Sequence, residues 1–222
     1  MSKPNLRVWS INGVTPVVDP AAFVHPSAVL IGDVLVGAGC YIGPSACLRG
    51  DFGRLEVRAG ANVQDCCVLH GFPGADTIVE EEGHIGHGAV LHSCVVRRGA
   101  MVGMNAVIND HAVIGESAIV AAMSFVKAGM VVPPRTLVAG VPARVVRELT
   151  DQEMTWKIEG TLAYQELTRR CLATMVETKA LARAEPGRTR IEVPELLPLS
   201  TIKAKRPQPG LSARKTRGSP RR

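Results

Sequence analysis

The segment Ala100–Val120 reads AMVGMNAVINDHAVIGESAIV and repeats itself every six residues. Each repeat carries an aliphatic residue, such as Val102 or Ile108, and a small residue two positions before it. A period of six fits neither the period of about 3.6 residues of an α-helix nor the two-residue period of a half-buried strand. An internal repeat of this kind is typical of a solenoid.

The same pattern runs through most of the first 140 residues. The aliphatic series consists of Val24, Leu30, Val36, Ile42, Leu48, Val57, Val63, Leu69, Val90, Val96, Val102, Ile108, Ile114, Val120, Val126, Val132 and Val138. The small-residue series includes Ala28, Cys40, Ala46, Ala100, Ala106, Ala112, Ala118 and Ser124. We predict a mainly β fold, a parallel β-helix over residues 1–149, with about 18 residues in each triangular coil. The aliphatic residues then point inward, the small residues permit tight corners, and the coils stack on one another.

Two irregularities interrupt the repeat. The segment Gly71–Gly83 lacks the pattern and is predicted to be a loop extruded from the coil. Ile85 and Leu91 stand one residue out of phase with Val90, so the segment after the loop is predicted to be locally shifted. Irregular loops on regular scaffolds often carry function, which directs attention to this region.

The chain changes character after residue 149. Thr150 and Glu153 form a capping-box pair that begins a predicted helix over residues 150–184. An apolar stripe on this helix is expected to lie along the β-helix. It consists of Met154, Ile158, Leu162, Leu167, Leu172 and Val176.

The charge is unevenly distributed. The net charge of the chain is +6, but the segment from Lys203 to Arg222 carries eight basic residues and no acidic one. Residues 1–202 therefore sum to 6 − 8 = −2, which argues against a specific nucleic-acid-binding domain. Residues 185–222 are predicted to be a basic, disordered tail.

The sequence lacks the features expected of a secreted or membrane protein. No apolar signal region follows the polar start, and no apolar run approaches the roughly 18 residues of a membrane span. The six cysteines form no CxxC pair and no disulfide framework. We therefore predict a cytoplasmic protein with reduced thiols and no membrane partner.

Histidines cluster beside the irregular segment. The stretch Gly83–His92 reads GHIGHGAVLH, and His70 precedes it. His70 and His87 are nearly one coil apart and would stack about 4.8 Å from each other if the coil were uninterrupted. His92 would point in another direction, so a single chain does not bring all three together, whereas a threefold trimer can. His84 is expected to be a loop residue or a partner of a ligand.

Several motifs resemble the gamma-class carbonic anhydrases. They are RGDFG at residues 49–53, NVQD at 62–65, His70, the histidines 87 and 92, and GVPAR at 140–144. The segments QDCCVLHGFPGADT and GHIGHGAVLH resemble more narrowly the phenylacetic acid degradation branch, PaaY. The resemblance implies a left-handed β-helix and a homotrimer. It also implies hydrolysis of CoA thioesters that arise in phenylacetate catabolism.

The resemblance further implies a metal shared between subunits. His70 and His92 of one subunit and His87 of its neighbour would be the ligands. Three neutral imidazoles with an open fourth position describe a catalytic zinc site, although Fe(II) and cobalt suit the same ligands. The metal would lower the pKa of its bound water toward 7 and so supply a hydroxide at neutral pH.

Five further residues resemble family residues around the metal. Gln64 would hydrogen-bond the metal-bound water or the substrate, and Tyr164 on the C-terminal helix would lie near the site. Arg49, Asp51 and Asp65 resemble interface ion-pair and orienting residues. These five complete the catalytic set that the resemblance predicts.

Phe52 departs from the family pattern. Active gamma-class carbonic anhydrases carry a glutamate at this position, directly after the aspartate of the RxD motif. A phenylalanine neither accepts nor relays a proton, so Phe52 weighs against fast CO2 hydration and instead predicts an apolar substrate pocket.

Four possibilities remain open at this point. The leading hypothesis is a metal-dependent acyl-CoA thioesterase, and CO2 hydration by the same ion is its close rival. A hexapeptide-repeat acyltransferase shares the coil and the trimer but uses a lone histidine as general base and needs no metal. A non-catalytic scaffold is the third alternative, against which the full set of histidines argues.

Overall fold

The computed structural model describes residues 6–192 together with residues 197, 199 and 201. The chain divides into two compact units, Met1–Glu192 and Val193–Arg222, and every named strand and helix lies in the first. This unit is a left-handed parallel β-helix of about 7 turns followed by one helix, as the six-residue repeat predicts. The predicted basic tail from Lys203 onward lies outside the described residues.

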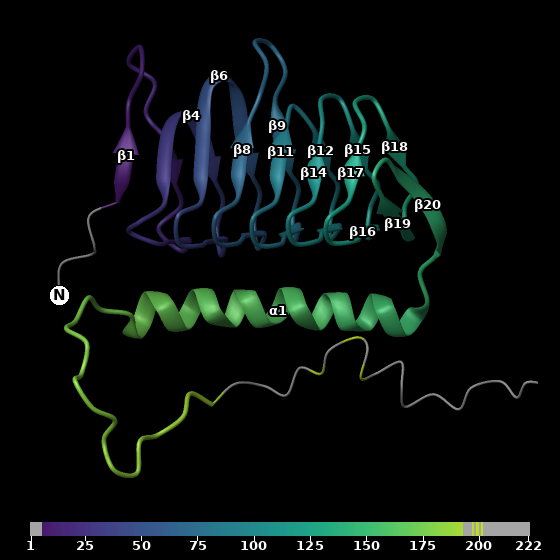
Figure 1. Ribbon diagram of the computed structural model, residues 1–222. Coiled ribbons are helices and arrows are strands. Elements are labelled where there is room, and N and C mark those ends of the chain that lie inside the picture. The colour runs from purple at the N-terminus through teal and green to yellow at the C-terminus, as the bar shows by residue number, and fades with distance from the viewer. Residues whose placement is uncertain (1–5, 193–196, 198, 200, 202–222) are drawn as a thin grey trace, which may run out of the picture. The chain divides into compact units, whose positions relative to one another are not determined.

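Two sheets wrap the solenoid (Figure 1). The 12-stranded sheet contains β1 (Arg7–Trp9), β2 (Val17–Val18), β4 (Val29–Val36), β6 (Cys47–Val57), β8 (Val68–His70), β9 (Thr77–Val79), β11 (Val90–His92), β12 (Val95–Val96), β14 (Val107–Ile108), β15 (Val113–Ile114), β17 (Phe125–Val126) and β18 (Val131–Val132). The 8-stranded sheet contains β3 (Phe23–Val24), β5 (Tyr41–Ile42), β7 (Asn62–Val63), β10 (His84–Ile85), β13 (Met101–Val102), β16 (Ile119–Val120), β19 (Thr136–Gly140) and β20 (Ala143–Glu148). The long strands β4 and β6 each continue from one side of the prism onto the next. The strands that pair with them on both sides therefore belong to one sheet.

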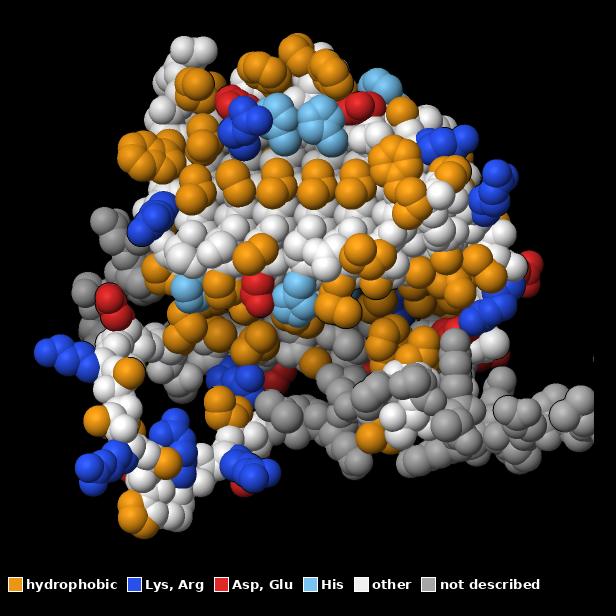
Figure 2. All heavy atoms as spheres, in the orientation of Figure 1, with side chains coloured by type: hydrophobic (Ala, Val, Ile, Leu, Met, Phe, Trp, Pro, Cys, Tyr) orange, Lys and Arg blue, Asp and Glu red, His pale blue; other side chains and the backbone are white. Residues whose placement is uncertain are grey.

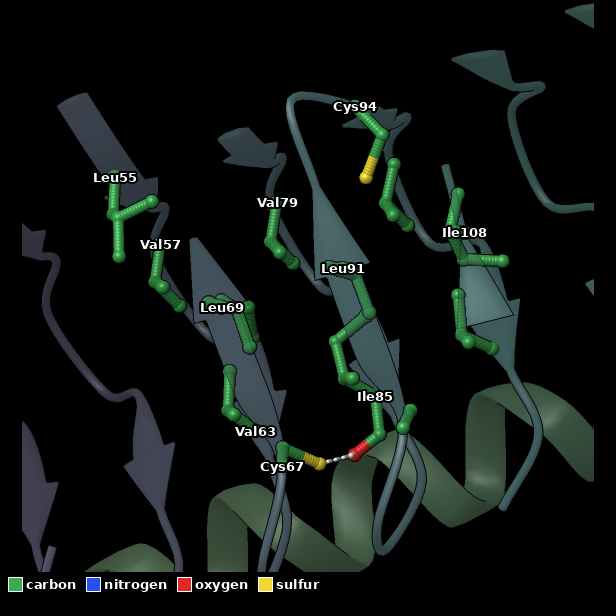
Figure 3. Close-up of a cluster of buried hydrophobic side chains, with 14 of the residues drawn as sticks. Leu55, Val57, Val63, Cys67, Leu69, Val79, Ile85, Leu91, Cys94 and Ile108 are labelled. Carbon is green, nitrogen blue, oxygen red and sulfur yellow. Dashed lines mark hydrogen bonds between the residues drawn. The ribbon is translucent and has the colours of Figure 1, made fainter. Parts of the chain in front are cut away.

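The predicted inward series forms the core. Every aliphatic member except Val90 is at most 4% exposed, and the small-residue series is buried as well. In Figure 3, Leu69, Leu91 and Ile108 project from successive coils into one interior. Burying a side chain of this size contributes about 1.5–3 kcal/mol, so the stack of coils accounts for much of the stability. The corners turn through residues in the left-handed backbone region, including Ser45, Cys66, Asn105, Ser117 and Met123.

The irregular segment is shorter than predicted. Thr77–Val79 forms β9 and pairs with β6, so the extruded loop covers residues 71–76 only. After the loop the inward series resumes at Val79 and continues through Ile85 and Leu91 to Val96. Val90 instead points outward, because side chains on a strand alternate between its faces and Leu91 takes the inner position.

Helix α1 (Asp151–Thr174) runs alongside the coils and begins at the predicted capping box (Figure 1). The backbone N–H of Glu153 donates to Thr150 Oγ1 at 3.3 Å, and the N–H of Thr150 donates to Glu153 Oε2 at 3.0 Å. The helix ends at Thr174, ten residues before the predicted end. Of the helices that the structure describes, none is long and apolar enough to cross a membrane.

The predicted apolar stripe of this helix faces the β-helix only in part. Met154 packs against Met101, Ile119 and Leu149, but most of the stripe is exposed. Ile158 and Leu162 are 50% and 55% exposed, whereas the buried residues of α1 are Glu153, Lys157, Thr161 and Thr168. The surface beneath the helix offers polar partners. Lys157 Nζ donates to the carbonyl of Gly99, and both carboxylate oxygens of Glu153 accept from Arg147 at 2.7 Å. Polar contacts with a backbone carbonyl and a guanidinium therefore anchor this face of the helix, next to the apolar packing of Met154 and Trp156.

Candidate functional site

His70 and His92 lie side by side on neighbouring coils. His70 ends β8, His92 ends β11, and the two are register partners in the sheet although 22 residues separate them. His70 Nδ1 and His92 Nε2 are 3.2 Å apart. An uninterrupted coil would stack His70 on His87, but the loop over residues 71–76 lengthens this coil and shifts the register to His92.

Carboxylates hold the outer nitrogens of both rings. Asp51 Oδ1 lies 3.0 Å from His70 Nε2, and Asp110 Oδ1 contacts His92 Nδ1. Arg49 donates to Asp51 Oδ2 at 2.9 Å. Burial alone would raise the pKa of Asp51, but hydrogen bonds from Arg49 and His70 outweigh it and leave that pKa below its usual value. The carboxyl of Asp51 therefore remains ionised and accepts hydrogen bonds only.

This arrangement constrains the two inner nitrogens. Since each outer nitrogen faces a carboxylate acceptor, it carries the N–H of its ring. In two neutral rings, His70 Nδ1 and His92 Nε2 would then present lone pairs to each other across 3.2 Å. A proton or a cation between them relieves this repulsion.

Two phenylalanine rings extend the row of imidazoles. The ring centroids of Phe52 and His70 are 5.4 Å apart, those of His70 and His92 are 5.2 Å apart, and those of His92 and Phe72 are 5.3 Å apart. Phe52 and Phe72 are 59% and 55% exposed. The backbone N–H of Phe72 donates to Ser93 Oγ at 2.6 Å, which fixes the loop beside the site.

Phe72 and Asp110 were not predicted from the sequence to lie beside these histidines. Phe72 belongs to the irregular loop. The insertion of that loop directly after His70 could have marked its residues as candidates for the site. Asp110 lies 18 residues after His92, which is one regular coil, so it follows from the repeat length once His92 is nominated.

A second polar cluster lies on another side of the prism, beneath α1. Gln64 Nε2 contacts Asn62 Oδ1 at 2.9 Å and His84 Nε2 at 2.7 Å, and Gln64 Oε1 accepts from the backbone N–H of His87 at 3.2 Å. Tyr164 of α1 stands edge-on to His84 with centroids 5.3 Å apart. His84 belongs to β10 and not to a loop, and burial lowers its pKa to about 4. It is a hydrogen-bond partner of Gln64.

His87 occupies the turn between β10 and β11, where its Nδ1 lies 3.1 Å from Asp65 Oδ2. The predicted site residues thus fall into two clusters. The first contains Arg49, Asp51, Phe52, His70 and His92, and the second contains Gln64, Asp65, His87 and Tyr164. Among the described residues of one chain, no group of three or more His, Cys, Asp or Glu side chains is placed to hold a metal ion. The shared metal and the trimer stay predictions.

An outward-facing row of apolar side chains, the apolar ladder, crosses the side of the prism that carries His70 and His92. Its register-paired members are Val29, Cys47, Val68, Val90, Val107 and Phe125. Val68 and Val90 stand two residues before His70 and His92, so they share the outer face of their strands with these histidines. Figure 2 shows a row of hydrophobic side chains across this face with histidines on both sides of it.

Comparison with known proteins places the chain among hexapeptide-repeat proteins. No family model matches the chain. It is 60% identical over 187 residues to carnitine operon protein CaiE of Citrobacter koseri, covering 84% of this chain and 95% of that one. CaiE of Salmonella typhimurium is 61% identical, with 84% and 94% covered.

Two solved structures share the fold at appreciable sequence identity. A Bacillus cereus protein assigned provisionally as an acetyltransferase gives a TM-score of 0.74 at 34% identity, covering 75% of this chain and 96% of that one. A hexapeptide transferase family protein of Anaplasma phagocytophilum gives 0.71 at 36% identity, with 73% and 96% covered.

These relatives correct the predicted branch. The chain was expected to resemble the phenylacetic acid degradation branch and its thioesterase, but proteins about 60% identical to it over nearly their full length bear the name CaiE. The hexapeptide-repeat assignment holds at the coarser level.

Proposed function

The chain belongs to the carnitine operon protein CaiE family of hexapeptide-repeat proteins, and from this we propose that it is an acyltransferase acting at the His70–His92 pair. One observation carries the proposal: a carboxylate orients each imidazole, and the more exposed ring, His92, faces solvent. The names of the two structurally similar proteins, an acetyltransferase and a hexapeptide transferase, support the same reaction class.

His92 acts as general base in this proposal. The acceptor hydroxyl, amine or water attacks the carbonyl carbon of an acyl thioester, its proton passes to the imidazole pair, and the carbon–sulfur bond breaks to release the thiolate. Asp110 holds the ring and stabilises the charge that forms. His70 shares that charge through the 3.2 Å contact. General-base catalysis of this kind contributes about 10²- to 10⁴-fold in rate.

A metal-dependent hydrolase is the second candidate, favoured by the facing inner nitrogens. Two zinc-bound imidazole nitrogens at about 2.0–2.1 Å from a tetrahedral ion lie roughly 3.3 Å apart, close to the observed 3.2 Å. Asp51 and Asp110 match the carboxylates that commonly orient metal-binding histidines. His70 and His92 therefore fit as two ligands. When bound, zinc would polarise an acyl carbonyl and acidify a water molecule.

Both candidates involve a second copy of the chain, seated on the apolar ladder. The ladder lies between the His70–His92 pair and the Asp65–His87 turn, so a copy that covers it brings one cluster toward the other. In a closed trimer with three identical contacts, the ladder of every copy would be covered by a neighbouring copy. The predicted homotrimer is thus supported by an apolar surface that a lone chain leaves in contact with solvent.

The deciding experiment measures thiol release from acetyl-CoA and longer acyl-CoAs by the full chain, with and without an acceptor. Carnitine is included because the relatives are named for a carnitine operon. Release that requires an acceptor, with an acylated product by mass spectrometry, supports transfer. Release without acceptor that stops on chelation supports the hydrolase. Absence of release from every donor, with metal present or absent, would overturn both.

A further inference from the structure

We propose that the segment after α1, residues 175–192, is an arm that binds a second copy of the chain, on the side of the prism that neither α1 nor the apolar ladder occupies. The proposal rests on the assembly suggested above but not on its reaction. Two apolar surfaces carry it, one on the arm and one on the coils, and a single chain leaves both in contact with solvent.

The arm lies apart from the coils of its own chain. Residues 175–192 are all exposed, and the backbone hydrogen bonds found along this segment are local. Segments that stay flexible in solution are poor in large apolar side chains, so the apolar residues of the arm are expected to pack on another surface. They are Met175, Val176, Leu181 and Ile191, which are 37%, 56%, 59% and 78% exposed.

The arm also belongs to the part of the chain that the relatives share. The match to CaiE of Citrobacter koseri spans 187 residues, or 84% of this chain. Only 174 residues precede the end of α1 at Thr174, so the match extends into the arm. The arm is therefore not an addition peculiar to this chain.

A second apolar row crosses the other side of the 12-stranded sheet. Its members alternate with buried residues such as Val79 and Val96, so their side chains face outward. Register pairing joins them coil by coil, and we call them the third-side row. They are Val17, Leu35, Glu56, Ile78, Val95, Val113 and Val131.

The third-side row is the surface that remains uncovered. The 8-stranded sheet carries α1, which contacts β3, β5 and β7. The apolar ladder forms the proposed contact between copies. Val17 and Val131, at the two ends of the third-side row, are 59% and 68% exposed. A continuous apolar strip on the surface of a chain marks an interaction site.

The arm is long enough to reach a neighbour. Its extended length is at most about 60 Å. The third-side row crosses strands about 4.8 Å apart, so it measures about 29 Å from end to end. The arm does not cover the row of its own chain, because every arm residue is exposed. An arm that crosses to the next copy can still cover the whole row there.

The first test places a photo-crosslinking residue, p-benzoyl-phenylalanine, at position 181 of the full chain. Copies with natural nitrogen and copies with heavy nitrogen are mixed equally, unfolded together, refolded and irradiated. We expect cross-links from position 181 to β9, β12 or β15, and about half of the linked peptides should join a light to a heavy copy, because copies assemble at random. Cross-links that never join the two labels would place the arm on its own chain and overturn the proposal.

Proteolysis of the folded protein gives an independent measurement. Trypsin cleaves after Lys179 and Arg183, and an arm bound to a neighbour is protected from it. Val95→Asp on the third-side row and Leu181→Asp on the arm should each raise the cleavage rate at these positions by roughly tenfold. Both changes are compatible with the fold, since Val95 faces outward and Leu181 is exposed.

Leu162→Asp is the matched control, because Leu162 is an exposed apolar residue of α1 outside both surfaces. Its arm should be cleaved at the rate of the parent protein. Equal cleavage rates in the parent protein and in both Asp variants would show an unbound arm and overturn the proposal. A parent protein that is monomeric by light scattering would overturn the assembly as well. Cross-linking between copies without acyl transfer from any donor would overturn only the proposed reaction.

Discussion

Asp110 holds His92 from the next coil of the solenoid, 18 residues further along the chain, with its carboxylate on His92 Nδ1. This contact orients the imidazole and fixes which nitrogen carries the proton. It depends on the regular repeat, because one coil of about 18 residues returns the chain to the same side of the prism. The scaffold thus places the proposed base and the carboxylate that orients it without a specialised loop.

Asp110→Asn should lower kcat for acyl transfer by roughly 10²-fold or more while leaving the melting temperature nearly unchanged. The amide of asparagine can donate to His92 Nδ1, which moves the ring proton to Nε2 and removes the lone pair that accepts the proton. Steady-state kinetics with a saturating acyl donor measure this. Asp33→Asn, which alters an exposed ion pair with Arg54, should retain full activity. An active Asp110→Asn variant would exclude His92 as the oriented base.

The six-residue pattern predicted most of the fold, because a repeat in which every sixth residue must be buried is compatible with few backbone arrangements. Ala100 to Val120 determine an inward and an outward side at every repeat, and all these inner positions are buried. The helix was harder to predict. Lys157 and Glu153 face the coils although most of the apolar stripe does not, and the carbonyl that Lys157 contacts belongs to Gly99, which is 58 residues away in the sequence.

The candidate site was only partly predictable for a related reason. His70 and His92 were predicted to belong to one site and are register partners in the structure, but which histidine stacks on His70 depends on the length of the loop. Sequence alone did not show that Thr77 returns to the sheet. Phe72 was missed because nothing in its immediate sequence reveals that the loop folds back beside His92.

Acid should destabilise the protein through His84. Burial lowers its folded-state pKa to about 4 from an ordinary value near 6.5. Between these values the unfolded chain binds a proton that the folded chain does not, so stability is lost as the pH falls from about 6.5 to about 4. The loss is about 3 kcal/mol at most for this group. Denaturant unfolding as a function of pH measures it.

His84→Gln provides the comparison for that measurement. Its side chain is uncharged at every pH and can still hydrogen-bond Gln64 and Asn62. The variant should show a flatter stability profile between pH 4 and pH 6.5 than the parent protein. Identical slopes for the two proteins would show that His84 does not govern the acid sensitivity.

Val68→Glu should dissociate the proposed trimer. Val68 lies in the middle of the apolar ladder, and a carboxylate there would be buried without a partner in the interface. Light scattering after size exclusion should report a trimer for the parent protein and a monomer for the variant. Val131→Glu, at an exposed position of β18 away from the ladder, should remain trimeric. A trimeric Val68→Glu variant would place the subunit contact elsewhere.

The metal content of the purified protein decides between the two candidate reactions. One chain supplies two suitable imidazoles, His70 and His92, and the third ligand of the predicted zinc site is His87 of another copy. If the hydrolase is correct, elemental analysis should find about one metal per chain, because each shared site draws its ligands from two copies. His87→Ala should then lose that metal yet remain a folded trimer, since the His87 side chain is about half exposed on a turn and pairs with Asp65. His111→Ala, at another corner outside both clusters, is the control and should keep its metal.

A metal-free parent protein that still transfers acyl groups would leave the His92–Asp110 base as the sole catalyst. Full metal occupancy in His87→Ala would show that the ion, if present, does not depend on the neighbouring subunit.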